Sequence, residues 1–268
     1  MSLPQILLTN DDGILSPGLW AAASALSEIG FVHVAAPRDQ YSAAGRSMPI
    51  TSDGVIEVRE VTVNDKCWKV HAVGGTPAQA VQHGILEIVP TKPDLVVAGI
   101  NYGENPGSGV TISGTIGAAM EGASFGIPAL AISLETEQKH HYSHSHEVDF
   151  STAAFFTRLF GCMLLDKRLP EDVNVLKVDI PCDATVDTPW VVTRQSRRPY
   201  FEPTAPARPS WDVPVHIGYH ITSDFSGDDH DTDIYAVFVR RLVSVTPLSL
   251  DLTSRLDLAA FERDLRQT

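Results

Sequence analysis

The sequence predicts an α/β protein built on a doubly wound, mostly parallel sheet. Three apolar runs, residues 6–8, 94–100 and 128–134, have the composition of strands that are buried on both faces. Apolar residues with helical spacing follow the first run, from Leu19 to Ile29. Because strands and helices alternate through the first half of the chain, we expect parallel βαβ units.

The first loop carries two adjacent carboxylates. Asp11 and Asp12 follow the first strand directly, and Gly13 allows a sharp turn. Ser16 and Pro17 then match the N-cap and first position of a helix. Open α/β sheets bind ligands at the carboxyl ends of their strands, and close like charges are costly without a cation. The loop is therefore either a site for a hard divalent metal ion or a simple Asp-Asp-Gly turn.

The next segments predict a second strand, a second polar loop and a hairpin. Residues 31–37 have the composition of a strand, and residues 38–51 form a polar loop at the same sheet edge as the first loop. Residues 55–63 and 67–73 predict a hairpin beside the main sheet. Thr76, followed by a proline, predicts the start of a helix.

A long glycine-rich loop follows the strand at 94–100. Asn101 comes directly after that strand, and the loop 101–113 leads into a helix that begins near Ser113, Gly114 and Thr115. The free N–H groups of such a helix start face any nearby anion, and a glycine there permits close approach of a phosphate. The alternative is that Ser113 is an ordinary N-cap.

The second half of the chain is less regular. We expect a helix over 149–165 and strands within 174–181 and 189–195. Residues 197–214, rich in Pro and Arg, predict a long irregular arm. The tail, 242–266, combines a β-like segment with a short amphipathic helix, and we expect it to pack on a partner subunit.

Composition limits the possible classes of protein. The 268 residues are 43% hydrophobic and 20% charged, with a net charge of −13, so a nucleic-acid polymer is not expected as partner. No segment is long enough to span a membrane, and the start lacks the features of a signal peptide. The three cysteines, an odd number without a CxxC motif, predict buried free thiols and a cytoplasmic protein.

Four of the ten histidines lie within residues 139–146. An exposed loop is the simplest interpretation of this segment. A transition-metal site is the alternative, because imidazole is a common ligand.

The topology brings three loops to one sheet edge. Asp11, Asp12, Ser42 and Asn101 then offer oxygen donors that match Mg²⁺, Mn²⁺ or Ca²⁺. A cation that faces a helix N-terminus suits hydrolysis of a phosphate ester. Competing motifs fail, since the first strand is not followed by GxGxxG, Thr115 stands where a P-loop has lysine, and no GxSxG is present.

Longer motifs carry a resemblance to a known family. The segments LLTNDDG with SPGL, GTPAQAV, DLVVAGINYGENPGSGVTISGTIGAAMEG, IPALAIS, TDIYAV and VSVTPLSLDLT resemble the survival protein E (SurE) family, from residue 5 to about 254. This resemblance implies a metal-dependent 5′-nucleotidase that also acts on 3′-nucleotides and short polyphosphate. It implies a Rossmann-like three-layer α/β sandwich with a β-rich appendage and a C-terminal oligomerisation tail.

The resemblance also assigns residues. It implies one divalent ion per subunit, Mg²⁺ or Mn²⁺, held by Asp11, Asp12, Ser42 and Asn101, with the two aspartates also catalytic. The phosphate and substrate contacts would come from Asn10, Asn105, Ser113, Gly114 and Thr115. We expect a single domain, 1–268, in which 1–135 hold the metal site and 136–268 supply further core elements, the arm and the tail, and a homodimer or homotetramer.

Three departures from the family pattern stand out. Ile112 replaces the usual Tyr and bears on the pocket wall. Ala43 and Ala44 follow Ser42 where Gly often occurs, and Arg240-Arg241-Leu242 replaces a Gly-Tyr entry to the next strand and bears on the subunit contact. The rival to an enzyme is a non-catalytic nucleotide-binding or metal-binding sensor that uses the same loops.

Overall fold

A nine-stranded sheet forms the centre of the protein. The computed structural model describes residues 3–63, 65–141, 143–222, 224–225 and 227–267. The strands lie in the spatial order β3 (Ile56–Val63), β4 (Lys66–Val73), β2 (Phe31–Pro37), β1 (Gln5–Thr9), β5 (Leu95–Tyr102), β6 (Ala129–Leu134), β7 (Val175–Ile180), β11 (Val243–Leu248) and β8 (Trp190–Val192).

The middle of this sheet is parallel, as the alternation of strands and helices predicts. β1 pairs in parallel with β2 and β5, and the parallel pairing continues through β6 to β7. The predicted hairpin is present as the antiparallel pair β3 and β4, although Asn64 in its turn lies outside the described residues. β4 pairs with β2, so the hairpin extends the main sheet.

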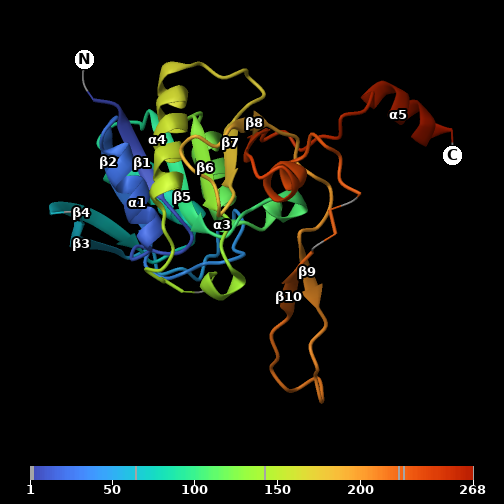
Figure 1. The fold of residues 1–268 in the computed structure, drawn as a ribbon, viewed down its shortest axis with the longest axis horizontal. Coiled ribbons are helices and arrows are strands. Elements are labelled where there is room, and N and C mark those ends of the chain that lie inside the picture. Colours follow the sequence, from blue (N-terminus) through green and yellow to red (C-terminus); the bar gives the residue numbers. More distant parts are fainter. Residues whose placement is uncertain (1–2, 64, 142, 223, 226, 268) are drawn as a thin grey trace.

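Helices cover both faces of the sheet and make it a three-layer structure. α1 (Pro17–Leu26) packs against α4 (Ser151–Asp166) on one face (Figure 1). α2 (Pro77–His83) packs against α3 (Gly114–Ser124) on the other face. β1 serves both layers, since Ile6 and Leu8 join the first apolar cluster and Leu7 joins the second. The predicted α/β sandwich is confirmed.

Local signals place most helix starts correctly. The Thr76 hydroxyl accepts a hydrogen bond from the Gln79 amide at 3.3 Å, and Gln79 Oε1 accepts one from the Thr76 amide at 3.0 Å, which completes a capping box. Ser16 occupies the N-cap of α1, but its side chain makes no capping bond. α1 ends at Leu26, three residues before Ile29, the last residue of the predicted helical spacing.

Short π-helical and 3₁₀ turns connect these elements. They are the π-helical turns η1 (Gly84–Ile88) and η4 (Tyr235–Val239), and the 3₁₀ turns η2 (Gly107–Thr111) and η3 (Gln138–His140). Two residues separate the end of η2 from the start of α3, so the loop after β5 is partly helical.

The arm and the tail project from this body (Figure 1). The arm is not wholly irregular, because β9 (Phe201–Thr204) and β10 (Gly218–Ile221) form a two-stranded antiparallel ribbon. The predicted tail begins too early: β11 is buried between β7 and β8, antiparallel to β7. Beyond it, α5 (Leu258–Arg266) has no buried residue.

The cysteine prediction needs correction. All three cysteines are free, but Cys67 and Cys182 are exposed and Cys162 is half-buried. Cys67 lies near the tip of the β3–β4 hairpin, opposite Thr62. Within the described part of the chain, none of the helices combines the length and the apolar character needed to cross a bilayer.

Candidate active site

Three loops at the carboxyl ends of β1, β2 and β5, together with His141 and the arm, line a cavity of about 470 Å³. Ligand pockets typically measure roughly 300–1,000 Å³. The residues predicted for the site that line it are Asp11, Asp12, Ser42, Asn101, Asn105 and Ser113. Asn10, Gly114 and Thr115 lie behind this lining.

Asp11 faces the start of α3. Thr115 Oγ1 donates a hydrogen bond to Asp11 Oδ1, and the backbone N–H groups of Gly114 and Thr115 add further donors. Burial nevertheless dominates and raises the pKa of Asp11 to about 6. The positive end of the α3 dipole is therefore directed at this carboxylate.

Asp12 is held by a different set of donors. Its Oδ2 accepts a hydrogen bond from the Tyr102 amide at 3.2 Å, and its Oδ1 accepts one from Gln40 Nε2 at 3.2 Å. Burial, and next the charge of Asp11, raise the pKa of Asp12 well above its usual value. Ionising these two neighbouring carboxyls is therefore unfavourable.

The donor set fits a hard divalent cation. Among the described residues, no lysine, arginine or histidine side chain forms an ion pair with Asp11 or Asp12. Asn101 Nδ2 donates to the carbonyl oxygens of Tyr102 at 3.3 Å and Gly103 at 2.8 Å, which leaves its amide oxygen for another partner. Oxygen donors without a compensating cation are what Mg²⁺ and Mn²⁺ prefer.

The loop that carries Ser42 is tied to both neighbouring loops. The Tyr41 amide donates to the Asp11 carbonyl oxygen at 2.7 Å. The Gly45 amide donates to the Ile112 carbonyl oxygen at 2.8 Å. Ser42 is therefore held between the first loop and the start of α3, at the edge of the cavity.

Three predicted substrate contacts have clear local roles. Asn10 Nδ2 donates to the Gly13 carbonyl oxygen at 3.0 Å, and Asn10 Oδ1 accepts from the Gly13 amide at 3.2 Å, so this side chain builds the turn. Ser113 caps α3 by accepting from the Ile116 amide at 3.2 Å. A Cβ on Gly114 would lie 2.7 Å from Asp11 Cβ and 2.8 Å from Asp11 Oδ2.

A buried ion network holds the loop that contains Asn105. The Asn105 amide donates to Asp179 Oδ1 at 2.8 Å, while Asn105 Nδ2 donates to Ser133 Oγ at 2.8 Å. Lys177 Nζ lies 2.5 Å from Asp179 and 2.8 Å from Asp233, and all three side chains are fully buried. The sequence did not predict this network, because Lys177 and Asp233 are 56 residues apart and no local pattern links them.

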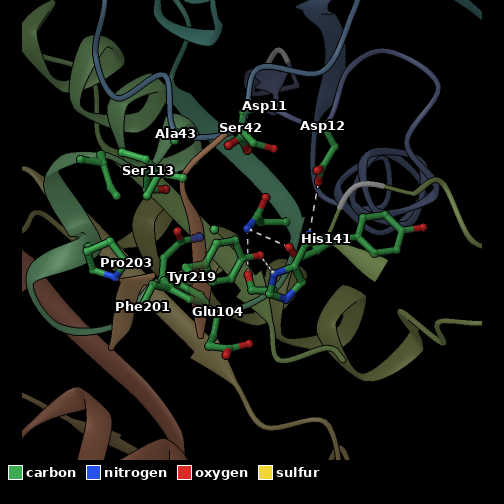
Figure 2. Close-up of a pocket in the computed structure, with 18 residues that line it drawn as sticks. Asp11, Asp12, Ser42, Ala43, Glu104, Ser113, His141, Phe201, Pro203 and Tyr219 are labelled. Atoms are coloured by element: carbon green, nitrogen blue, oxygen red, sulfur yellow. Dashed lines mark hydrogen bonds between the residues drawn. The ribbon is translucent and has the colours of Figure 1, made fainter. Parts of the chain in front are cut away.

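The histidine-rich segment is not an exposed loop throughout. His140 and His141 are buried, and His141 lines the cavity. His144 Nε2 forms a hydrogen bond with the Asp12 carbonyl oxygen at 2.8 Å. The segment is buried here because it folds back between the first loop and the arm. Figure 2 shows His141 on the opposite side of the cavity from Asp11 and Ser42.

One further cluster has the composition of a metal site. Among the described residues, Glu135, Cys182 and Asp183 bring three ligand atoms together. Arg241 already pairs with Glu135 at 2.6 Å and with Asp183 at 2.6 Å, and its Nη2 lies 3.4 Å from Cys182 Sγ. The guanidinium supplies the positive charge, so this cluster is an ion pair within the chain.

The comparisons with known proteins agree with this fold. A profile of the family Survival protein SurE matches residues 6–202. The chain belongs to the SurE family. The 5′-nucleotidase SurE of Thermococcus gammatolerans is 42% identical, covering 94% of this chain and 92% of that protein. The 5′-nucleotidase SurE of Archaeoglobus fulgidus is 40% identical, covering 96% of each.

A solved SurE structure has a similar fold over nearly the whole chain. The crystal structure of the SurE protein from Aquifex aeolicus superimposes with a TM-score of 0.76 at 31% identity, covering 98% of this chain and 100% of that one. The arm and the tail are therefore within the aligned length. Each of these proteins is similar to this chain over nearly its full length.

The departures from the SurE pattern lie where they affect the cavity and its surroundings. Ile112 lines the cavity and is 54% exposed, so it forms part of the rim. Ala43 adopts a φ of 58°, in the left-handed region that favours glycine, which is the residue that the family resemblance predicts here. Arg241 binds acidic groups of its own chain.

Proposed function

We propose that this protein is a divalent-metal-dependent phosphatase that hydrolyses nucleoside 5′-monophosphates to nucleoside and phosphate. The observation that carries the proposal is the pair of buried carboxyls, Asp11 and Asp12, at the wall of a nucleotide-sized cavity. Their raised pKa values show how unfavourable two anions are there without a cation. The relatives named 5′-nucleotidase SurE support the same reaction.

We assign the metal ligands to Asp11, Asp12, Ser42 and Asn101, which line one end of the cavity. A divalent ion bound there, Mg²⁺ or Mn²⁺, would offset the phosphate charge and activate it toward attack by water. The chain itself orients the ligands: Thr115 fixes Asp11, and Gln40 with the Tyr102 amide fixes Asp12. These supporting hydrogen bonds orient the two carboxylates.

The phosphate would lie between these ligands and the start of α3. Ser113 and Asn105 line this part of the cavity. The Ser113 hydroxyl accepts the capping bond from Ile116 and keeps its proton for donation. The N-terminus of α3 adds positive potential on the side of the cavity where the phosphate would lie. The Asp11 carboxylate also interacts with this positive end of the helix.

The test is phosphate release from a panel of nucleoside monophosphates, in EDTA and after addition of Mg²⁺ or Mn²⁺. An enzyme releases phosphate only with metal, and Asp12→Asn releases none. A sensor binds nucleotide and metal without releasing phosphate. Metal-dependent binding of AMP with no turnover would therefore establish the sensor function and exclude the phosphatase.

We also propose that the tail pairs copies of this chain into a homodimer or homotetramer. The apolar side chains of α5, Leu258, Phe261 and Leu265, are 61%, 47% and 61% exposed. The helix has an apolar stripe at helical spacing and a start capped by Asp257, as a helix with a binding partner has. Light scattering of the full chain and of a chain ending at Leu250 tests this: the full chain is oligomeric, and the shortened chain dissociates.

The compartment is the remaining part of the proposal. Free cysteines, two of them exposed, are compatible with a reducing cytoplasm. Fractionation of cells that express the chain, with a cytoplasmic marker as control, tests this assignment.

A further inference from the structure

One row of neighbouring residues across the sheet is polar, although β5 and β6 are otherwise largely apolar. Asn101 on β5 pairs with Ser133 on β6, and Ser133 pairs with Asp179 on β7. Residues paired in this way point to the same face of a sheet. Ser133 and Asp179 are buried and do not line the cavity. Asn101 is an assigned metal ligand, so the polar character of its two neighbours calls for a separate explanation.

Both neighbours bind Asn105, which does line the cavity. Ser133 Oγ accepts a hydrogen bond from Asn105 Nδ2 at 2.8 Å, and Asp179 Oδ1 accepts one from the Asn105 amide at 2.8 Å. Lys177, two residues before Asp179 on β7, donates from its Nζ to the Asn105 carbonyl oxygen at 3.3 Å. The backbone N–H, the backbone carbonyl and the side-chain amide of Asn105 are therefore all held.

The charges of this network fix the position of its members. Lys177 Nζ lies 2.5 Å from Asp179 Oδ2 and 2.8 Å from Asp233 Oδ2, so with Asn105 each of its three N–H groups has an acceptor. Burial lowers the pKa of Lys177, but the charges of the two aspartates and the hydrogen bonds to them raise it above its usual value. Asp233 Oδ2 also accepts from the Gly107 amide at 3.0 Å. The loop after β5 is thus tied at two points to aspartates that share one cation.

Stability alone does not explain these buried charges. Replacing a buried ion pair by apolar residues of similar volume is often neutral or stabilising, because taking charges out of water is costly. Val175, on the same face of β7, packs into one apolar cluster, and Val178, on the other face, packs into the second. Since β7 accepts apolar side chains on both faces, the charges at positions 177 and 179 are best explained by the loop that they hold.

We propose that Asp179, Lys177 and Ser133 are positioning residues that hold Asn105 for contact with the substrate phosphate. The proposal rests on the proposed function and assigns it residues outside the cavity lining. The loop needs such anchors because Gly103 and Gly107, on either side of Asn105, both have positive φ and give the chain little stiffness. A displacement of about 1 Å at a reacting group can lower the rate by roughly a hundredfold.

The competing explanation is that the network only stabilises the fold. Asp179→Val tests this, because it removes the acceptor of the Asn105 amide and leaves Lys177 paired with Asp233. Positioning predicts that kcat/KM for AMP in saturating Mn²⁺ falls by roughly tenfold to a hundredfold. Inorganic phosphate then inhibits less strongly, while calorimetric Mn²⁺ affinity is unchanged. Asp179→Asn, whose amide oxygen can still accept from the Asn105 amide, keeps most of the wild-type kcat/KM and phosphate inhibition.

A double-mutant cycle with Asn105→Ala decides whether these residues act through Asn105. Asp179→Val and Ser133→Ala each lower kcat/KM in the wild-type chain, and neither causes a further loss where Asn105 is already alanine. Losses that multiply in the double variants overturn the proposal. Ser133→Ala removes a single hydroxyl, so its cycle still decides the question if Asp179→Val does not fold.

Val178→Ala is the matched control. Val178 lies between Lys177 and Asp179 on β7, but its buried side chain packs in the apolar cluster on the opposite face. This variant lowers the melting temperature by leaving a cavity, and it keeps wild-type kcat/KM at temperatures where it is folded. A loss of kcat/KM in Val178→Ala equal to that in Asp179→Val overturns the proposal and makes the network structural only.

Amide hydrogen exchange in the metal-free protein gives a readout without turnover. Exchange at Asn105 is faster in Asp179→Val and unchanged in Val178→Ala and Asp179→Asn. Unchanged exchange at Asn105 in Asp179→Val overturns the proposal.

The failure of the proposed function looks different. A wild-type protein that releases no phosphate from any nucleotide with Mn²⁺ contradicts the phosphatase. Calorimetric titration with inorganic phosphate in Mn²⁺ then decides the positioning role. Weaker phosphate binding by Asp179→Val than by wild type supports this role, whereas equal binding, or no binding by wild type, overturns it.

Discussion

Replacing Gly114 with alanine tests how α3 serves the metal site. The sequence suggested that a glycine at this position leaves room for a phosphate. The structure gives it a nearer neighbour, because an added Cβ would lie 2.7 Å from Asp11 Cβ, 2.8 Å from Asp11 Oδ2 and 3.0 Å from Asp11 Cγ. Real Cβ atoms do not approach so closely, so either the Asp11 side chain or the first turn of α3 must move.

The size of the effect follows from two opposing contributions to the free energy of unfolding. Alanine in place of glycine favours a helix by about 1 kcal/mol. Overpacking a buried site costs about 1–3 kcal/mol. The net loss of stability is at most about 2 kcal/mol, which lowers the melting temperature by at most roughly 4–8 °C for a chain of this size. A displaced Asp11 weakens metal binding by roughly 10–100-fold.

The assay is a Mn²⁺ titration of AMP hydrolysis, together with calorimetric Mn²⁺ binding and thermal melting in EDTA. Gly161→Ala in α4 is the control, because its added Cβ would meet only the ends of flexible side chains, Ile29 Cδ1 at 3.1 Å and Leu26 Cδ2 at 3.2 Å. The control binds Mn²⁺ normally. If Gly114→Ala keeps normal Mn²⁺ affinity and loses only kcat/KM, the steric reasoning about Asp11 is refuted and a phosphate contact is favoured.

Four other substitutions give three predictions of different kinds. Asp11→Asn abolishes phosphate release. Folding raises the pKa of Asp11 from 3.8 to about 6, so ionising this carboxyl costs the folded protein roughly 3 kcal/mol. In EDTA the variant therefore has a higher melting temperature than wild type above about pH 6, and the same melting temperature near pH 4. A melting difference that is independent of pH would refute this. Ser42→Ala and Asn101→Ala each raise the Mn²⁺ concentration for half-maximal activity by roughly 10–100-fold, and unchanged titrations would remove both residues from the site. Lys177→Met lowers the free energy of unfolding in urea by about 3–5 kcal/mol, since it leaves two buried aspartates unpaired; a loss below about 1 kcal/mol would show that they are protonated in the native protein.

The sequence predicts the central sheet well because its signals there are local. Continuous apolar runs identify β1, β5 and β6, and Thr76 marks the start of α2 through a capping box that spans four residues. The rule that parallel strands end at one sheet edge then brings Asp11, Asp12, Ser42 and Asn101 to one cavity. Only their placement, and not their binding of metal, follows from this rule.

The remaining features depend on contacts that have no local pattern. The sequence predicts β11 as part of a tail, but in the structure β11 lies between β7 and β8. This position depends on pairing between strands that are distant in sequence. The same holds for His141, which is polar in sequence and buried because the arm covers it. Gly114 and Asp11 are 103 positions apart in the printed sequence, so their close approach is also invisible to spacing rules.

The position of β11 has a consequence for synthesis and folding. This strand is made after every other strand of the sheet, but it fills a place inside the sheet, where it covers the edge of β7 and supports β8. Until residues 243–248 leave the ribosome, β7 exposes unpaired backbone groups of the kind that drive edge-to-edge aggregation. The long sequence separation of these pairings also slows folding. A nascent chain stalled before residue 243 should therefore depend on chaperones and be sensitive to proteases, whereas one extended past 248 should resist both.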